Sequence, residues 1–276
     1  MHLILREIGK KGIRNETKMT REHPVELSFE KIGEGIPIIL LHGYPLNRTI
    51  WKGVIPFLQD ISNVVLPDLR GHGNSPVPEG EYSMETMAAD VTALMDTLKI
   101  EKAIIVGHSM GGYVSFALAR YFPGRLMGLG LIATQATPDT PERFKARMET
   151  IQEVKKKGAG VVSTSMINRL TPDRKLDAEL GRIMEGATTQ GLIGTLHGIA
   201  KREDATPWLA STQVPTMILS GKMDAIIPRE KAQEMADLIP LSWWIEIPEG
   251  GHMPMMEDPQ ITGIALRSLV LKVIAN

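Results

Sequence analysis

A serine, an aspartate and a histidine follow three separate apolar segments of this sequence. Ser109, Asp224 and His252 each follow the end of such a segment within a few residues, inside a stretch rich in turn-forming residues. A serine hydroxyl is a weak nucleophile until a neighbouring base takes its proton; a histidine can be that base, and an aspartate can hold its ring in the required tautomer. The three residue types, in this order, therefore predict nucleophilic catalysis at a carbonyl carbon.

Ser109 lies at the centre of the clearest local pattern. The apolar run 104–106 leads into Gly107-His108-Ser109-Met110-Gly111-Gly112, and a helix-forming run follows over 114–121. Strand, sharp turn and helix in this order are typical of a nucleophile elbow. The positions two before and two after the serine crowd each other, which Gly107 and Gly111 tolerate, and Gly112 lets the helix pack closely on the strand. The alternative is a tight turn with an idle serine.

Other residues compete for the roles of acid and base. Asp224 alone could be a turn or cap residue, and the chain has seven histidines. His72 lies in a glycine-rich loop and reads as structural, while His42 is expected to order the loop after its strand. His108 is next to the nucleophile, so its side chain should point elsewhere. Three strand ends in one order favour His252 as the base.

Stabilising a developing oxyanion requires two N–H donors. The backbone N–H of Met110, directly after the serine, is the first donor, and it lies at a helix N-terminus. The second is expected from the loop His42-Gly43-Tyr44-Pro45 after the apolar run 37–41. Within this loop the N–H of Tyr44 is the best candidate, so Gly43 and Tyr44 are predicted to lie beside Ser109.

The elements that must position these residues alternate along the chain. Short apolar runs of this kind are typical of strands buried on both faces of a parallel sheet. Alternation with helices predicts an α/β fold with helices on both faces, whose strand ends form one rim where ligands bind. The predicted strands are 25–32, 37–41, 64–67, 104–106, 126–133, 214–220 and 243–247, and the predicted helices of this part are 49–59, 83–98, 114–121, 230–238 and 259–274.

The alternation stops between residues 134 and 206. Only helical patterns occur there, at 141–157, 161–169, 173–186 and 188–200. This predicts an inserted all-helical cap, residues 134–206, over a core made of residues 23–133 and 207–276; residues 1–22 are a basic N-terminal extension of unclear role. The apolar residues of the cap pack internally or line a substrate pocket: Met148, Ile151, Met166, Leu170, Met184, Leu192 and Leu196.

Composition excludes several classes of protein. A net charge of −1 over 276 residues gives no electrostatic footprint for nucleic acid. No apolar run approaches the roughly 20 residues of a membrane span. The absence of cysteine excludes disulfides and thiolate metal sites. We therefore expect a cytoplasmic enzyme with a small-molecule substrate, without nucleic acid, metal or organic cofactor.

Taken together, these motifs resemble the α/β-hydrolase superfamily. The resemblance rests on His42-Gly43-Tyr44-Pro45, the segment Asp68-Leu69-Arg70-Gly71-His72-Gly73-Asn74-Ser75, the elbow around Ser109, Gly221-Lys222-Met223-Asp224 and Gly251-His252. It implies an eight-stranded, mostly parallel sheet with a helical cap after strand six, and a serine nucleophile. Dehalogenases and epoxide hydrolases of this superfamily carry aspartate in place of Ser109, so the resemblance argues against both.

Within the serine branch, the chain is similar to small carboxylesterases, 3-oxoadipate enol-lactonases and cofactor-free perhydrolases. We expect a carboxylesterase for short- to medium-chain esters; the alternatives are a lactonase or perhydrolase using the same residues, or a hydrolase-fold sensor of a small molecule. A dicarboxylate substrate would need a basic cluster. The cap arginines are expected on solvated helix faces instead: Arg143, Arg147, Arg169 and Arg182.

Overall fold

A seven-stranded sheet runs through residues 23–275, the part of the chain that the computed structural model describes. Its spatial order is β1-β3-β2-β4-β5-β6-β7; β1 is antiparallel to β3, and all other neighbours are parallel. The extension predicted at residues 1–22 lies outside the described residues. The strands are β1 (Phe29–Ile32), β2 (Ile36–Leu41), β3 (Ser62–Pro67), β4 (Ala103–His108), β5 (Leu126–Ile132), β6 (Thr216–Gly221) and β7 (Ser242–Ile247).

The predicted class of fold is confirmed, whereas the strand count of eight is one too many for the described residues. The seven strands correspond to the seven apolar runs of the sequence, and only the family resemblance implied an eighth. The chain before β1 has other partners for its backbone. Val25 N–H donates to Asp90 Oδ1 (2.9 Å) and Ser28 N–H to Ser75 Oγ (2.8 Å), so these groups do not pair with a further strand.

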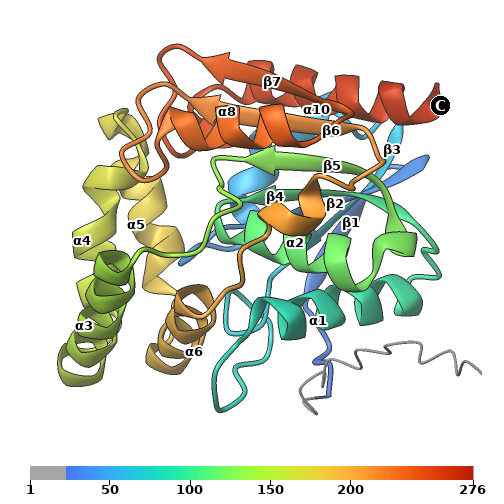
Figure 1. Cartoon of the computed structure of the whole chain (residues 1–276). Helices are drawn as coiled ribbons and strands as arrows, with labels where there is room; N and C mark the ends of the chain where they lie inside the picture. Colours follow the sequence, from blue (N-terminus) through green and yellow to red (C-terminus); the bar gives the residue numbers. More distant parts are fainter. Residues whose placement is uncertain (1–22, 276) are drawn as a thin grey trace, which may run out of the picture.

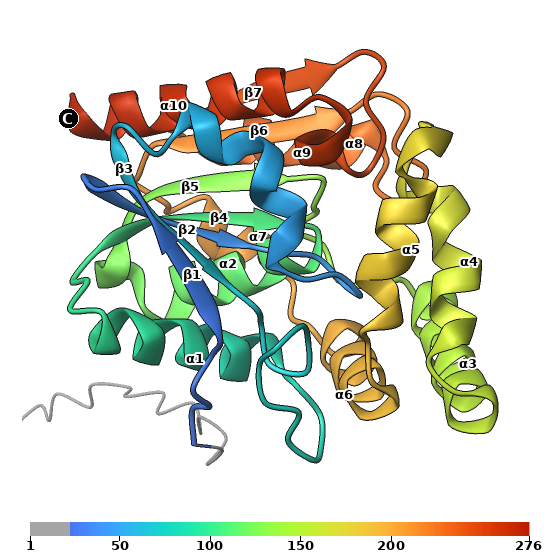
Figure 2. The same cartoon turned by 180° about the vertical axis from the view of Figure 1, so that it is seen from behind.

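Helices cover both faces of the sheet, because alternate residues of each central strand point to opposite sides. Ile39 and Leu41 of β2 belong to one buried apolar cluster, and Ile38 and Leu40 belong to the other. Helices α1 (Met84–Thr97), α2 (Met110–Tyr121) and α8 (Arg229–Leu238) cover the first side, while η1 (Arg48–Phe57), α9 (Pro254–Glu257) and α10 (Pro259–Ile274) cover the second (Figures 1 and 2).

The segment predicted as a helix at 49–59 is a 3-10 helix, η1. Its apolar residues do face the core, since Trp51 and Val54 are fully buried. Pro56 lies inside the segment and has no N–H for an α-helical hydrogen bond. The periodicity therefore predicted the buried face correctly but not the type of helix.

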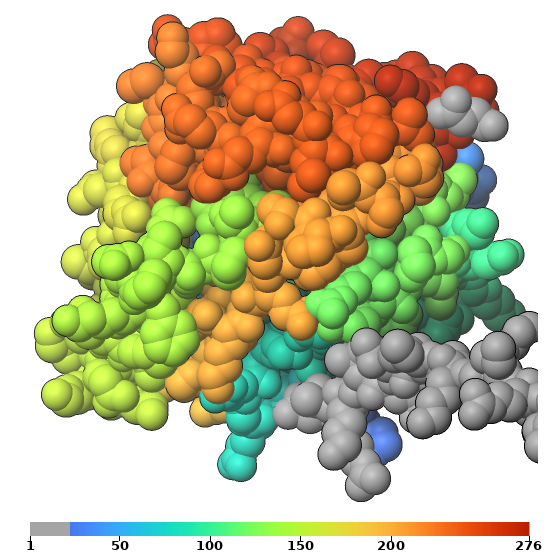
Figure 3. All heavy atoms as spheres, in the orientation of Figure 1, coloured from blue at the N-terminus to red at the C-terminus, as the bar shows by residue number. Residues whose placement is uncertain are grey.

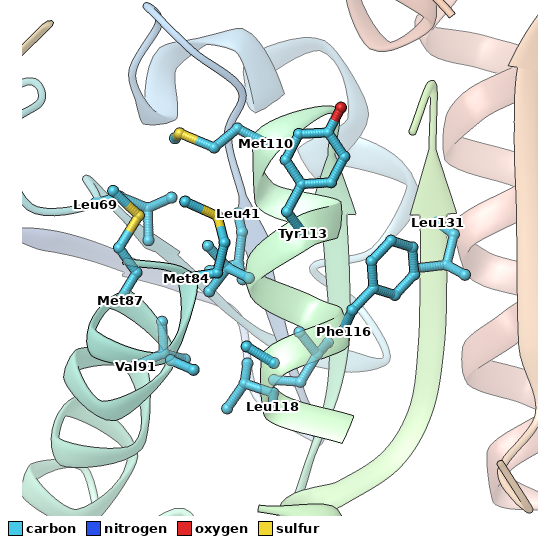
Figure 4. Close-up of a cluster of buried hydrophobic side chains, with 14 of the residues drawn as sticks. Leu41, Leu69, Met84, Met87, Val91, Met110, Tyr113, Phe116, Leu118 and Leu131 are labelled. Carbon is cyan, nitrogen blue, oxygen red and sulfur yellow. The ribbon is translucent and has the colours of Figure 1, made fainter. Parts of the chain in front are cut away.

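Helix α2 carries the elbow and packs between α1 and the sheet. Figure 4 shows Met84, Met87 and Val91 of α1 on one side of α2, with Leu41 of β2 behind them. Burying side chains of this size contributes about 1.5–3 kcal/mol each. The N-terminus of α2 is therefore held in place by a large apolar contact.

A group of helices lies beyond the carboxyl end of β5 (Figure 1). The four α-helices match the helical patterns of the sequence, with one short 3-10 turn added. On the face shown in Figure 3 they adjoin the C-terminal part of the chain, drawn in orange and red. They are α3 (Pro141–Lys157), α4 (Gly160–Leu170), η3 (Arg174–Leu176), α5 (Asp177–Glu185) and α6 (Thr189–Ala200); α7 (Thr206–Leu209) follows them on the way back to β6.

The entry and exit of this helical group are joined to each other. Arg202 donates to Thr137 O (3.0 Å) and forms an ion pair with Asp139 (2.9 Å), both side chains being almost fully buried. Ala205 N–H donates to Ala136 O (2.9 Å). The Arg202 guanidinium also lies 4.2 Å from the centre of the Tyr113 ring, on α2. The chain therefore leaves and re-enters the sheet domain at one place.

Candidate active site

Ser109 occupies a strained turn between β4 and α2. Its φ is 51° and its ψ is −111°, a left-handed conformation that non-glycine residues rarely adopt. Hydrogen bonds hold this backbone: Ser109 N–H donates to Ile132 O (2.9 Å), and Ser109 O accepts from Thr134 Oγ1 (2.8 Å). Ser109 is half-buried between the fully buried His108 and Met110. The turn therefore presents the serine at the end of the sheet.

The glycines of the elbow are needed for close backbone approach. A Cβ on Gly107 would lie 2.2 Å from Gly111 O, and one on Gly111 would lie 2.4 Å from Leu41 O. A Cβ on Gly112 would lie 2.4 Å from Thr134 Oγ1. Real Cβ atoms do not approach other atoms so closely, so no side chain fits at these positions.

His252 and Asp224 are brought together as the sequence predicted. His252 Nδ1 lies 2.8 Å from Asp224 Oδ2, and both side chains are 2% exposed. The other carboxylate oxygen accepts two backbone hydrogen bonds, from Ile226 N–H (2.7 Å) and Ile227 N–H (3.0 Å). Burial raises the pKa of Asp224, but the charge and hydrogen bond of His252 outweigh it, so the pKa is lowered. The aspartate is an anion that fixes the His252 ring through Nδ1, and Nε2 has no hydrogen-bond partner among residues 23–275.

His108 connects the elbow to the histidine loop. Its Nε2 lies 2.8 Å from His252 O, and the two rings are 5.0 Å apart. A carbonyl only accepts, so His108 carries its proton on Nε2. Burial lowers the pKa of His108 to about 3, so the ring is neutral. Ser109 Oγ itself makes no hydrogen bond to His252 within the described residues, and such bonds often tighten only when substrate binds.

Two other histidines lie in the loops around the site. His42 bridges Gly43 O (3.0 Å) and the N–H of Leu69 (2.9 Å), which joins the loops after β2 and β3. His72 Nδ1 donates to Arg70 O (3.0 Å). Burial lowers the pKa of His42 to about 4 and that of His72 to about 3, so both rings are neutral. Their partners are backbone groups of the loops.

The loop after β2 lies against the elbow. A Cβ on Gly43 would lie 3.1 Å from Ser109 Cβ and 2.6 Å from His108 Nδ1, so only glycine fits. The next residues form a tight turn with a cis Tyr44–Pro45 peptide bond and a hydrogen bond from Leu46 N–H to Gly43 O (3.0 Å). Tyr44 N–H makes no hydrogen bond to the described residues. It and the first N–H of α2, from Met110, are thus available beside Ser109.

Two contacts around His252 had no signal in the sequence. Glu257 accepts from Gly251 N–H (2.5 Å), and His252 N–H donates to Leu170 O (3.0 Å) at the end of α4. Burial raises the pKa of Glu257. The histidine loop is therefore held from α9 on one side and from the helical group on the other.

A cavity of about 250 Å³ opens next to these loops. Tyr44 and Ile226 line it from the sheet domain, and helices α3, α4 and α6 supply the remaining wall. Met166 and Leu196 are among the lining residues, so these two residues of the helical group face a pocket. The others named in the sequence contribute to the two buried clusters: Met148, Ile151, Leu170, Met184 and Leu192.

The expectation of solvated arginines was wrong for Arg143 and Arg147. Both are half-buried, and with the exposed Arg169 they line the cavity. Their partners lie before α3 begins, so helical periodicity could not reveal them: Arg143 donates to Gln135 Oε1 (3.1 Å), and Arg147 pairs with Asp139. Arg182 is exposed and lies outside this cavity, as expected.

Residues 23–275 contain neither a metal-binding cluster nor a helix able to span a membrane. No group of three or more histidine, aspartate and glutamate side chains is placed to hold a metal ion within that range. None of its helices has the length and apolarity to cross a membrane.

Comparisons with known proteins identify the family of this chain. Residues 36–259 match the sequence family described as the alpha/beta hydrolase fold, and the chain belongs to that family. A thermophilic esterase from Thermogutta terrifontis, solved with malate bound, is 39% identical with a TM-score of 0.87, covering 90% of this chain and 94% of that one.

Two curated relatives cover a similar share of the chain. The AB hydrolase superfamily protein YisY of Bacillus subtilis is 32% identical over 87% of this chain and 93% of its own length. The 3-oxoadipate enol-lactonase 2 of Acinetobacter baylyi is 26% identical over 89% of this chain and 93% of its own. The protein is therefore a hydrolase of this fold with both an esterase and a lactonase among its relatives.

Proposed function

We propose that the protein is a serine carboxylesterase that cleaves short- to medium-chain esters through an acyl-enzyme. The observation that carries the proposal is the 2.8 Å contact between His252 Nδ1 and the Asp224 carboxylate, next to a serine at φ 51°. In this orientation, His252 Nε2 is placed to accept the hydroxyl proton of Ser109. The 39% identical Thermogutta esterase supports the same reaction class.

The reaction proceeds in two halves. Ser109 Oγ attacks the ester carbonyl carbon while its proton moves to His252 Nε2, and the oxyanion accepts hydrogen bonds from the N–H groups of Met110 and Tyr44. The C–O bond then breaks, and the leaving alcohol takes the proton. Water, deprotonated by His252, attacks the acyl-enzyme and releases the acid and free Ser109. Each oxyanion donor lowers the barrier by about 2.7–4 kcal/mol in comparable enzymes.

The test is hydrolysis of p-nitrophenyl esters of increasing chain length, with the Ser109→Ala variant as control. We expect rapid turnover of the shorter esters by the native protein and none above background by the variant. Equal rates for both proteins would refute the assignment of Ser109 as the nucleophile. A single slow cleavage with lasting occupancy of the site would favour the sensor instead.

A lactonase is the second candidate, favoured by the Acinetobacter relative. A lactone is an internal ester, so Ser109, His252 and Asp224 would have the same roles, with the leaving alkoxide remaining on the product. Comparing a lactone with its open-chain ester separates the two activities. A perhydrolase would share these residues but transfer the acyl group to hydrogen peroxide. Formation of a peracid from an ester in the presence of peroxide would detect this activity.

A further inference from the structure

The cavity of about 250 Å³ adjoins the proposed catalytic residues. Ile226, one of its lining residues, donates its N–H to Asp224, and Tyr44, another, follows the Gly43 that packs against Ser109. The cavity is thus placed to receive the part of a substrate that lies beyond the reacting carbonyl. The residues that line the cavity are therefore placed to select the substrate.

Positive charge gathers on this cavity. Three arginines line it, and no acidic side chain is among its described lining residues. Among the residues that the structure describes, Arg143 donates to two neutral oxygens, Gln135 Oε1 (3.1 Å) and Ile226 O (2.5 Å), and to no carboxylate. Arg147 pairs with Asp139, but that carboxylate also pairs with Arg202, so two guanidinium groups share one negative charge. The wall therefore carries a net positive charge.

Arg169 is the arginine that remains free to bind. It lies at the end of α4, is exposed, and makes no hydrogen bond or ion pair with any other described residue. A guanidinium presents parallel N–H donors that match a carboxylate. Next to it, Val162, Met166 and Leu196 give the cavity apolar surface that suits a methylene chain.

We propose that this cavity binds a carboxylate at the far end of the acyl group, so that the preferred substrates are monoesters of dicarboxylic acids. The inference rests on the proposed esterase function and narrows its substrate class. The apolar wall holds the methylene chain, and Arg169, which lines the cavity together with Arg143 and Arg147, holds the distal carboxylate. Ser109 then attacks the ester at the other end.

The test compares esters of equal shape and different charge. Monomethyl glutarate and methyl 5-methylhexanoate differ in that a carboxylate replaces an isopropyl group, and pH-stat titration measures the hydrolysis of both. Monomethyl succinate and adipate, each with its own neutral counterpart, allow for the distance between serine and arginine. We expect a higher kcat/KM for the anionic member of at least one pair, with the advantage shrinking as salt is added.

Variants at Arg169 assign the preference to the cavity. Because an exposed ion pair is screened by solvent and contributes only modestly to binding, Arg169→Met should lower kcat/KM for the anionic ester about fivefold. Arg169→Glu should lower it further, and in both variants the ratio of kcat/KM for the anionic ester to kcat/KM for its neutral counterpart should fall. Arg182→Met is the matched control, since Arg182 is exposed on α5 outside this cavity. Equal loss on both esters, or equal loss in the control, overturns the proposal.

A binding measurement separates this inference from the proposed function. Glutarate titrated calorimetrically into the native protein should bind, and Arg169→Glu should abolish that binding. Arg169-dependent binding without hydrolysis of any ester would support the subsite and refute the esterase. Hydrolysis of neutral esters with no preference for anionic ones and no glutarate binding would overturn the subsite alone. Tighter binding of inorganic phosphate than of glutarate would overturn the carboxylate assignment.

Discussion

The side chain of His108 holds the backbone of His252: its Nε2 donates to the His252 carbonyl oxygen at 2.8 Å, across 144 positions of sequence. This bond joins the turn that carries Ser109 to the loop that carries the proposed base. His108 is fully buried, so it fixes the distance between the two loops from inside the protein. His108 is therefore a positioning residue.

Replacing His108 tests this role. His108→Phe removes the donor and leaves a buried carbonyl without its partner, which destabilises a loop by about 1–3 kcal/mol. We expect kcat for ester hydrolysis to fall roughly tenfold while KM stays close to that of the native protein. His108→Gln can still donate to the carbonyl and should recover part of the loss. If His108 served only for packing, His108→Phe and His108→Gln would have the same kcat whenever their thermal stabilities are equal.

The Asp224→Asn variant tests whether the Asp224 carboxylate orients His252. The amide can still accept from the N–H groups of Ile226 and Ile227, but it holds His252 in the wrong tautomer. We expect kcat to fall by about four orders of magnitude, as in a protease with the same change. Asp237→Asn, on the exposed side of α8, is the control and should leave kcat unchanged. Full activity of Asp224→Asn would show that another residue orients His252.

Glycine at 111 can be compared with glycine at 124. A Cβ on Gly111 would lie 2.4 Å from Leu41 O, whereas one on Gly124 would meet nothing within 4 Å. Because backbone atoms cannot move aside without disturbing β2, Gly111→Ala should lower the free energy of unfolding by about 1–3 kcal/mol and reduce activity. Gly124→Ala should be neutral or slightly stabilising. Urea denaturation of the two variants measures the difference, and equal stabilities would show that the elbow has more room than the structure indicates.

The buried histidines predict how stability depends on pH. Burial lowers the pKa of His42 to about 4 and the pKa values of His72 and His108 to about 3, from an ordinary value of 6.5. The unfolded chain therefore binds more protons than the folded one as pH falls below 6.5. Their contribution to stability is complete above that pH and is lost progressively down to about pH 4 for His42 and about pH 3 for the other two.

Urea denaturation at a series of pH values measures this loss. Each of the three histidines contributes up to roughly 1.4 kcal/mol per pH unit within its window. In His72→Phe the slope of the free energy of unfolding against pH should be smaller than in the native protein, by the amount that corresponds to about one bound proton. A free energy of unfolding that stays constant between pH 6.5 and about pH 5 would contradict the neutral, buried state of these rings.

Local patterns allowed most elements to be predicted. Helix 141–157 has the bounds expected from the sequence, because Thr140 caps its start, Pro141 takes the first position, and Gly158 ends it at φ 85°. These signals act within one turn of the chain. In the same way, the apolar runs were enough to locate strands whose ends carry Ser109, Asp224 and His252.

Contacts between distant segments could not be predicted. The sequence suggested that His108 points away from the site, but its partner is 144 residues further on. The arginines of α3 were expected in solvent because their partners, Gln135, Asp139 and Ile226, lie before the helix or in another loop. Periodicity shows which face of a helix is apolar, whereas a polar side chain's partner depends on tertiary packing.

The joined entry and exit of the helical group have a consequence for how this chain can vary. The Asp139–Arg202 ion pair and the Ala136–Ala205 hydrogen bond join the two connections. The chain between them is therefore a long loop whose two ends are held together at the sheet domain. Doubling the length of such a loop costs only about 0.6 kcal/mol of closure entropy. Helices can therefore be added, removed or exchanged between these two points while Ser109 keeps its supports in the sheet domain and His252 keeps its contacts with Asp224 and His108, although its bond to Leu170 O belongs to the exchanged part. Substrate range and bond-breaking chemistry can change separately in a protein built in this way.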